Sequence, residues 1–154
     1  MCYNTTASQT DERMYSSIEL LTSLLQFFAM DADAQLDYAK GIPLTLKEEN
    51  FPFGLDHSPL IEMVNGTHNI GRVFAAEPNV SSKAIEALED FETVVELIRT
   101  QRLDEILNWT VSSLRSSAKW RLVRKLSRIA LQSLGIPLSR PAIAYEELIP
   151  FVMD

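Results

Sequence analysis

Residues 118–137 read AKWRLVRKLSRIALQSLGIP and carry the clearest helix signal in the chain. Apolar side chains recur along it at intervals of three and four residues, which is the spacing of an amphipathic helix. Gly135 can take the left-handed conformation that commonly ends a helix, and Pro137 prevents the helix from continuing. The sequence therefore predicts one helix over Ala118–Leu134.

Three kinds of side chain share the circumference of this predicted helix. The first face is apolar apart from one serine and consists of Trp120, Val123, Ser127, Ala130, Leu131 and Leu134. A second apolar face consists of Leu122, Leu126 and Ile129. The remaining arc carries four cations that we name the basic ridge: Arg121, Arg124, Lys125 and Arg128. Because both apolar faces need cover, we expect only the basic ridge to stay in water and this helix to be the central one of a bundle.

Glycine and proline divide the rest of the chain. Residues 41–78 hold four of the five glycines and four of the seven prolines, whereas residues 79–134 hold none. Since both residue types interrupt helices, we expect an irregular excursion at 41–78 and long helices over 79–134. Within the excursion, Ser58 and Pro59 predict the start of one short helix, Leu60–Val64.

Weaker signals place the other elements. Two short extended pieces are expected in the excursion, at Ile42–Leu46 and Asn69–Phe74. Helices are expected elsewhere: from about Asp11 onward, over Ala34–Ala39, from Ser81 or Ser82 onward, and from Arg140 to about Leu148 within residues 140–149. Residues 1–9 are expected to be frayed. The chain is therefore predicted to be one all-α domain, a bundle of about five to six helices over 1–154.

Length and composition set the class of protein. A chain of 154 residues is the size of one domain, and it is long enough to bury a core without disulfides. Its single cysteine, Cys2, excludes an internal disulfide and favours a reducing compartment. The N-terminal residues lack the pattern of a signal peptide, and no apolar run is long enough to span a bilayer. We expect a soluble, cytoplasmic protein.

Charge is distributed unevenly along this acidic chain, whose net charge is −7. Residues 1–105 carry 18 acidic and 7 basic side chains, whereas residues 106–145 carry 7 basic side chains and no acidic one. Three interpretations of the basic segment stay open. The basic ridge could pair with an acidic face on the preceding helix or be solvated, it could bind an acidic protein, or it could bind nucleic acid. The acidic face in question is Glu86, Glu89, Glu92 and Glu96.

No catalytic or cofactor motif accompanies these features. Cys2, His57 and His68 are the residues best suited to nucleophilic or metal chemistry, and none has the spacing that such a site needs. We therefore expect no enzyme activity, no cofactor and no metal. An enzyme would require a pocket in the 41–78 excursion that gathers both histidines with nearby carboxylates.

These patterns favour a function in recognition. We expect a non-enzymatic adapter or regulatory protein, of the inhibitor, antitoxin-like, immunity-like or chaperone-like kind, that contacts an acidic or apolar helix surface of another protein. The same complementary charges could pair two copies of the chain. The alternative is a nucleic-acid-binding transcriptional regulator that uses the basic residues between 115 and 128. The expected contact residues are Trp120, Arg121, Arg124, Lys125 and Arg128.

Overall fold

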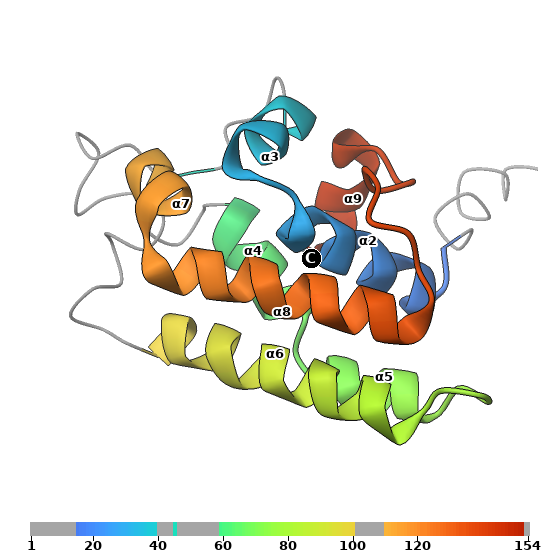
Figure 1. The fold of residues 1–154 in the computed structure, drawn as a ribbon. Coiled ribbons are helices and arrows are strands. Elements are labelled where there is room, and N and C mark those ends of the chain that lie inside the picture. Colours follow the sequence, from blue (N-terminus) through green and yellow to red (C-terminus); the bar gives the residue numbers. More distant parts are fainter. Residues whose placement is uncertain (1–14, 40–44, 46–58, 101–109, 153–154) are drawn as a thin grey trace, which may run out of the picture.

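The computed structural model describes residues 15–39, 45, 59–100 and 110–152, and all regular structure in these ranges is helical (Figure 1). The helices are α2 (Ser17–Ala29), α3 (Ala32–Tyr38), α4 (Pro59–Gly66), α5 (Ile70–Ala75), α6 (Ser82–Thr100), α7 (Val111–Ser116), α8 (Ala118–Leu134) and α9 (Tyr145–Val152). The predicted all-α fold is confirmed. The described residues form eight helices in place of the expected five to six, because the excursion contributes α5 and the serine-rich segment forms α7. No helix in the described ranges combines the length and apolar character needed to cross a membrane.

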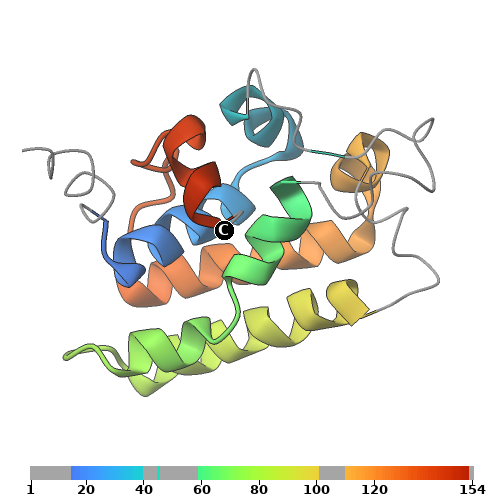
Figure 2. The ribbon, with the colours of Figure 1, turned by 180° about the vertical axis from the view of Figure 1, so that it is seen from behind.

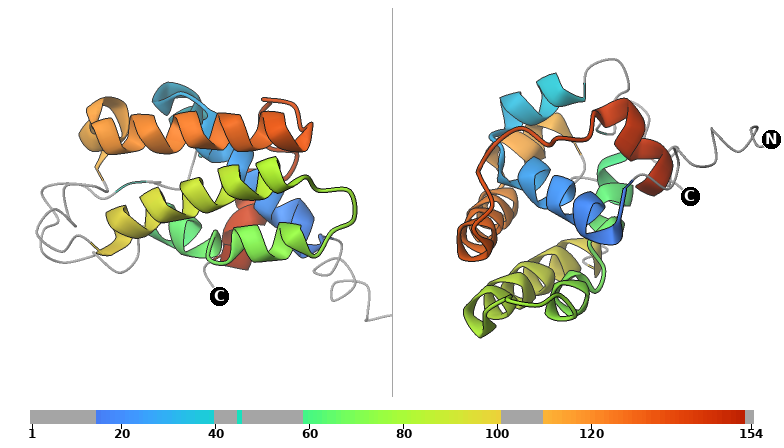
Figure 3. Two further views of the ribbon diagram at one scale, coloured as in Figure 1. Left: turned by 60° about the horizontal axis from the view of Figure 1, so that its bottom comes forward. Right: turned by 90° about the vertical axis from the view of Figure 1, so that its right-hand side faces the viewer.

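Helix α2 occupies the centre of the molecule. Helices α6 and α8 lie side by side and run in opposite directions (Figure 1), while α2 packs on α8 and also contacts α4 and α5. The view from behind shows α4 and α9 on the side of α2 away from α8 (Figure 2), and the end-on view shows α2 with helices on several sides (Figure 3). Eight of the 13 residues of α2 are buried. The central helix is therefore α2, and the prediction that α8 would be central was wrong.

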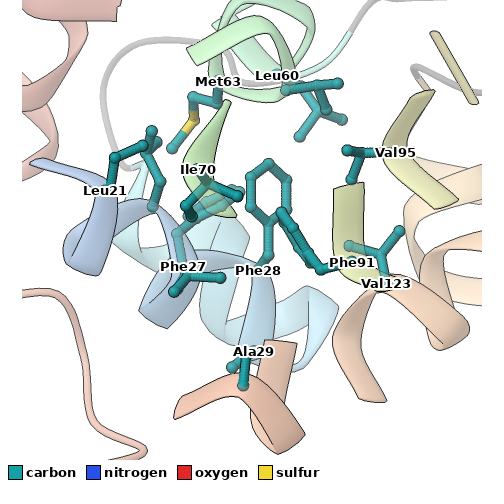
Figure 4. Close-up of a cluster of buried hydrophobic side chains, with 14 of the residues drawn as sticks. Leu21, Phe27, Phe28, Ala29, Leu60, Met63, Ile70, Phe91, Val95 and Val123 are labelled. Carbon is teal, nitrogen blue, oxygen red and sulfur yellow. The ribbon is translucent and has the colours of Figure 1, made fainter. Parts of the chain in front are cut away.

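Aromatic side chains from three helices form the middle of the core. The ring of Phe28 on α2 lies 5.9 Å from the ring of Phe91 on α6, and 6.2 Å from the nearly parallel ring of Trp120 on α8. Leu60 and Met63 of α4 close the core on another side (Figure 4). These contacts join α2, α4, α6 and α8 into one apolar interior.

Helix α8 has the predicted bounds. The Ser117 hydroxyl accepts a hydrogen bond from the backbone N–H of Lys119 at its start, and Gly135 ends it with φ +74°. The first apolar face is buried, as predicted, with Leu134 partly so. The second face is divided. Leu126 is partly buried against the core, whereas Leu122 is 43% exposed and Ile129 is 37% exposed. Since α6 and α2 cover only two flanks of α8, these two side chains remain on its outward arc.

Helix α2 starts at Ser17, because Ser16 and Glu19 form a capping box in which each side chain accepts from the other's backbone N–H. The helix start predicted near Asp11 lies outside the described residues. The predicted bounds of the last helix differ from the structure. Helix α9 starts at Tyr145, later than the predicted start at Arg140, and it continues through Pro150 instead of stopping before it.

Tertiary contacts explain why α9 passes through Pro150. A proline inside a helix costs about 3 kcal/mol because it removes one backbone hydrogen bond. Beyond it, the Phe151 ring packs edge-on against the Tyr15 ring at 5.8 Å, and Val152 lies against Gly66 at the end of α4. These contacts bury apolar surface that would otherwise face water, which offsets the missing hydrogen bond.

The excursion is more helical than expected where the structure describes it. The short helix predicted at Leu60–Val64 is present as α4. The extended piece predicted at Asn69–Phe74 is wrong, because this segment forms α5. Asn69 takes a left-handed conformation with φ +64° and turns the chain from α4 into α5, and Ile70 and Phe74 then bury one face at helical spacing. The piece predicted at Ile42–Leu46 lies outside the described residues, apart from Thr45.

Two other helices start close to the predicted positions. Helix α3 spans Ala32–Tyr38 rather than Ala34–Ala39, with Asp31 as its N-cap residue. Helix α6 begins at Ser82, and the Ser81 hydroxyl accepts from the backbone N–H of Ala84. One side of α6 is buried and consists of Ala84, Ala87, Leu88, Phe91, Val95 and Ile98, and Val94 beside it is partly exposed.

Two neighbouring tyrosines allow a matched test of the packing around α3 and α9. The Tyr38 hydroxyl donates to the Ile143 carbonyl at 2.7 Å in a buried position. The Tyr145 ring packs edge-on against Tyr38 at 5.6 Å, but its buried hydroxyl has no hydrogen-bond partner among the described residues. Burial is the main cause that raises the pKa of both phenols, so both are neutral at ordinary pH.

We expect Tyr38→Phe to lower the free energy of unfolding by about 1–2 kcal/mol, because it leaves the Ile143 carbonyl without its donor. Tyr145→Phe is expected to change that free energy by less than about 0.5 kcal/mol, since it removes an unpaired buried hydroxyl. Urea denaturation followed by circular dichroism measures both. Equal losses in the two variants would contradict the hydrogen-bond assignment.

Candidate functional site

The basic ridge divides into an outward half and an inward half on α8. Arg121 and Lys125 are exposed, whereas Arg124 and Arg128 are half-buried where α8 meets the end of α2. The Lys125 ammonium makes no hydrogen bond or ion pair to any residue that the structure describes. The Arg121 guanidinium donates to the Ser116 carbonyl at 2.7 Å. The outward pair is therefore the part of the ridge that a partner can reach.

The inward pair completes the C-terminal end of α2. The last carbonyls of a helix lack donors, and the helix dipole makes that end negative. Helix α2 has no basic residue in its own last turn. Arg124 donates through Nε to the Met30 carbonyl at 2.6 Å, and Arg128 donates through Nε to the Ala29 carbonyl at 2.8 Å. Two guanidinium groups from α8 thus supply the charge and the donors that α2 lacks.

Arginines also hold α3 in place through its three aspartates. Each aspartate forms an ion pair with one arginine. The distances between nitrogen and oxygen are 3.1 Å for Arg128 and Asp31, 3.0 Å for Arg115 and Asp33, and 3.1 Å for Arg140 and Asp37. The three arginines come from α8, α7 and the segment after α8. All three pairs are partly exposed, so each contributes about 0–1 kcal/mol on its own.

One of the open interpretations paired the basic ridge with the acidic face of α6. No ion pair between the ridge and α6 occurs in the described ranges, so this interpretation does not hold there. The reason is the rotation of α6: Glu92 accepts a hydrogen bond from the backbone N–H of Gly71 at 2.7 Å, and Glu89 lies beside the same glycine. That face of α6 therefore points toward α5, whereas α8 packs on another side. Internal pairing does occur, but with the end of α2 and with α3.

The basic ridge borders a hollow of about 410 Å³. Its lining consists of Asp31, Arg121, Arg124, Lys125, Arg128 and Ile129. Burial lowers the pKa of Arg124, and the nearby charges of Arg128 and Arg121 lower it further, while Asp31 acts in the opposite direction. Four cations therefore share the hollow with one carboxylate, and an anionic group placed there would relieve their mutual repulsion.

Trp120 does not belong to this surface. It was expected to contact a partner, but its side chain is only 2% exposed and stacks on Phe28 in the core. The indole faces inward because residue 120 lies on the same side of α8 as Val123 and Ser127, which are both fully buried. A partner could touch Trp120 only if α8 left the bundle.

A second hollow, of about 550 Å³, lies between the α4–α5 turn and α6. It is lined by Val64, Asn65, Thr67, His68, Asn69, Glu92, Thr93, Val95, Glu96 and Arg99. His68 is exposed at its edge, whereas Cys2 and His57 lie outside the described residues. No three histidine, cysteine, aspartate or glutamate side chains of the described ranges come close enough together to hold a metal ion.

Sequence reasoning missed the residues that surround both sites. Asp31, Asp33 and Asp37 fall within seven residues, a density that could have marked them as partners for the basic segment. No pattern in the sequence indicated the second hollow. Its two sides, residues 64–69 and residues 92–99, come together through the packing of α5 on α6.

The chain matches no protein family, no curated protein and no solved structure.

Proposed function

We propose that the protein is a non-enzymatic, cytoplasmic adapter or regulator that binds an acidic partner protein through the outward arc of α8. The observation that carries this proposal is the combination of side chains on that arc. Arg121 and Lys125 are exposed beside the exposed apolar side chains of Leu122 and Ile129. We name these four residues the α8 contact face.

The α8 contact face suits a protein partner because it offers two kinds of interaction. Leu122 and Ile129 are seven residues apart, so they lie two turns apart on one stripe of the helix. Burying them against a partner would supply affinity, at about 25 cal/mol for each Å² of apolar surface. Arg121 and Lys125 would speed the encounter with an acidic surface and fix its orientation.

Nucleic acid is the weaker alternative for the same basic segment. Binding to a phosphate backbone requires several cations that are able to reach successive phosphates. The Nε atoms of Arg124 and Arg128 are already bonded to carbonyls of α2, and Arg115 is paired with Asp33. The net charge of −7 also repels a polyanion at long range.

Charge reversal on the α8 contact face tests the proposal. We expect Arg121→Glu with Lys125→Glu to reduce capture of an acidic protein from native lysate at least tenfold, because repulsion replaces attraction. The matched control is Arg72→Glu with Lys83→Glu, which makes the same charge change at two exposed positions on α5 and α6. Mass spectrometry of the captured proteins, with and without nuclease treatment, provides the readout.

Three outcomes count against the proposal. Equal capture by the α8 variant and the wild type would mean that the α8 contact face does not bind the partner. Equal loss in both variants would indicate a general effect of net charge. Capture that disappears after nuclease treatment would favour the nucleic-acid alternative.

A further inference from the structure

We infer that the hollow between the α4–α5 turn and α6 is a binding site for a small polar molecule that carries a primary amine. We name it the α5–α6 groove. It shares no residue with the α8 contact face, so this inference does not rest on the proposed function.

The α5–α6 groove has the dimensions of a ligand site. Its volume of about 550 Å³ falls within the range of small-molecule pockets, which is roughly 300–1,000 Å³. Val64, Thr67 and Val95 are buried and form its interior wall. Polar side chains from both sides surround this wall, which is the usual arrangement of a site that binds and orients a small polar molecule.

One carboxylate in the groove is held in position by the backbone. Glu92 Oε1 accepts from the Gly71 N–H at 2.7 Å. Residue 71 is buried against α6, and a Cβ at this position would lie 3.6 Å from the same oxygen. A carboxylate has about four acceptor sites in all, so Glu92 can accept further hydrogen bonds from a ligand without releasing Gly71.

The charges of the lining favour a cationic ligand. Glu96 and Arg99 form an ion pair with each other one turn apart on α6, so their charges offset. Glu92 has no cationic partner among the described residues. The groove therefore presents one positioned carboxylate without a counter-charge, and a charge-assisted hydrogen bond from an ammonium would supply it.

The other polar groups fit an amine better than a metal ion. An ammonium has three donors, and Asn65 and Asn69, which also line the groove, have side-chain amides with an acceptor oxygen. A metal ion would need several anionic or imidazole ligands together, and no such group of three occurs in the described ranges. His68 at the edge can donate to or accept from the rest of the ligand.

Three four-carbon probes separate charge from shape. The experiment titrates 1,4-diaminobutane, 1,4-butanediol and succinate into the full chain and follows backbone amides by ¹H–¹⁵N NMR. The Gly71 amide reports directly on Glu92, because the two are hydrogen-bonded. We expect 1,4-diaminobutane to shift this amide in a saturable way, with a Kd of roughly 1 mM for so small a molecule, and the other two probes to leave it unchanged.

Two single substitutions on α6 complete the test. Glu92→Gln keeps an acceptor for Gly71 but removes the charge, so we expect about tenfold weaker binding of 1,4-diaminobutane. Glu86→Gln is the control, because Glu86 is exposed on the same helix and does not line the groove. A saturable shift that weakens only in Glu92→Gln supports the site. Absence of saturation, equal weakening in both variants, or a preference for succinate would overturn it.

Discussion

Trp120→Ala is expected to lower the free energy of unfolding by about 3–5 kcal/mol. The indole is almost fully buried, and its ring lies nearly parallel to that of Phe28 at the junction of α2 and α8. Truncation removes a large apolar side chain and leaves a cavity that the surrounding helices can only partly fill. Urea denaturation followed by circular dichroism at several concentrations of protein measures the loss.

Leu122→Ala is the matched control for Trp120→Ala. Leu122 lies two residues further along the same helix, but it is 43% exposed, so its truncation is expected to cost less than about 1 kcal/mol. If both substitutions cost the same free energy of unfolding, Trp120 cannot be a buried core residue. The two substitutions also help to interpret binding experiments. Because Trp120 is buried, a Trp120 variant that fails to bind a partner has lost stability rather than a direct contact with the partner.

Replacing the inward half of the basic ridge gives the second large effect. Arg124→Gln with Arg128→Gln is expected to lower the free energy of unfolding by about 3 kcal/mol, from two charge-assisted hydrogen bonds at the lower end of their usual range. The loss arises mainly from the Met30 and Ala29 carbonyls, which lose their donors. The ion pair with Asp31 adds little because Asp31 is largely exposed.

The outward half of the ridge provides the control for that experiment. Arg121→Gln with Lys125→Gln removes the same two charges from the same helix, yet we expect a change of less than about 0.5 kcal/mol. Thermal unfolding of the wild type and the two double variants at low and moderate salt measures the difference. A similar destabilisation by both double variants would mean that the ridge acts through net charge alone, and the division into an inward and an outward half would fail.

Local chemistry explains which elements could be predicted from the sequence. The bounds of α8 follow from its apolar period and from Gly135 and Pro137 at its end, and each of these signals lies within the helix or next to it. The burial of one face of α6 follows in the same way from its repeat. Signals of this kind do not depend on what the rest of the chain does.

The predictions that were wrong concern features that depend on distant parts of the chain. The exposure of Leu122 and Ile129 depends on how many flanks of α8 other helices cover, which no local pattern specifies. The passage of α9 through Pro150 depends on contacts of the residues around it with Tyr15 and Gly66. The pairing of the basic ridge likewise depends on the rotation of α6. Each of these outcomes is set by packing between segments that are distant in the sequence.

The Nε contacts of Arg124 and Arg128 also restrict how this chain can vary over evolutionary time. Lysine carries the same charge, but it lacks the planar guanidinium group. An arginine can donate a hydrogen bond to a carbonyl through one nitrogen and still offer its other N–H groups to further acceptors. Exchange to lysine would therefore be tolerated at position 121 but selected against at positions 124 and 128, while position 125 is itself a lysine. Conserved arginine at those two positions in descendants of this chain would reflect the completion of a helix end, and should not be mistaken for the signature of a ligand.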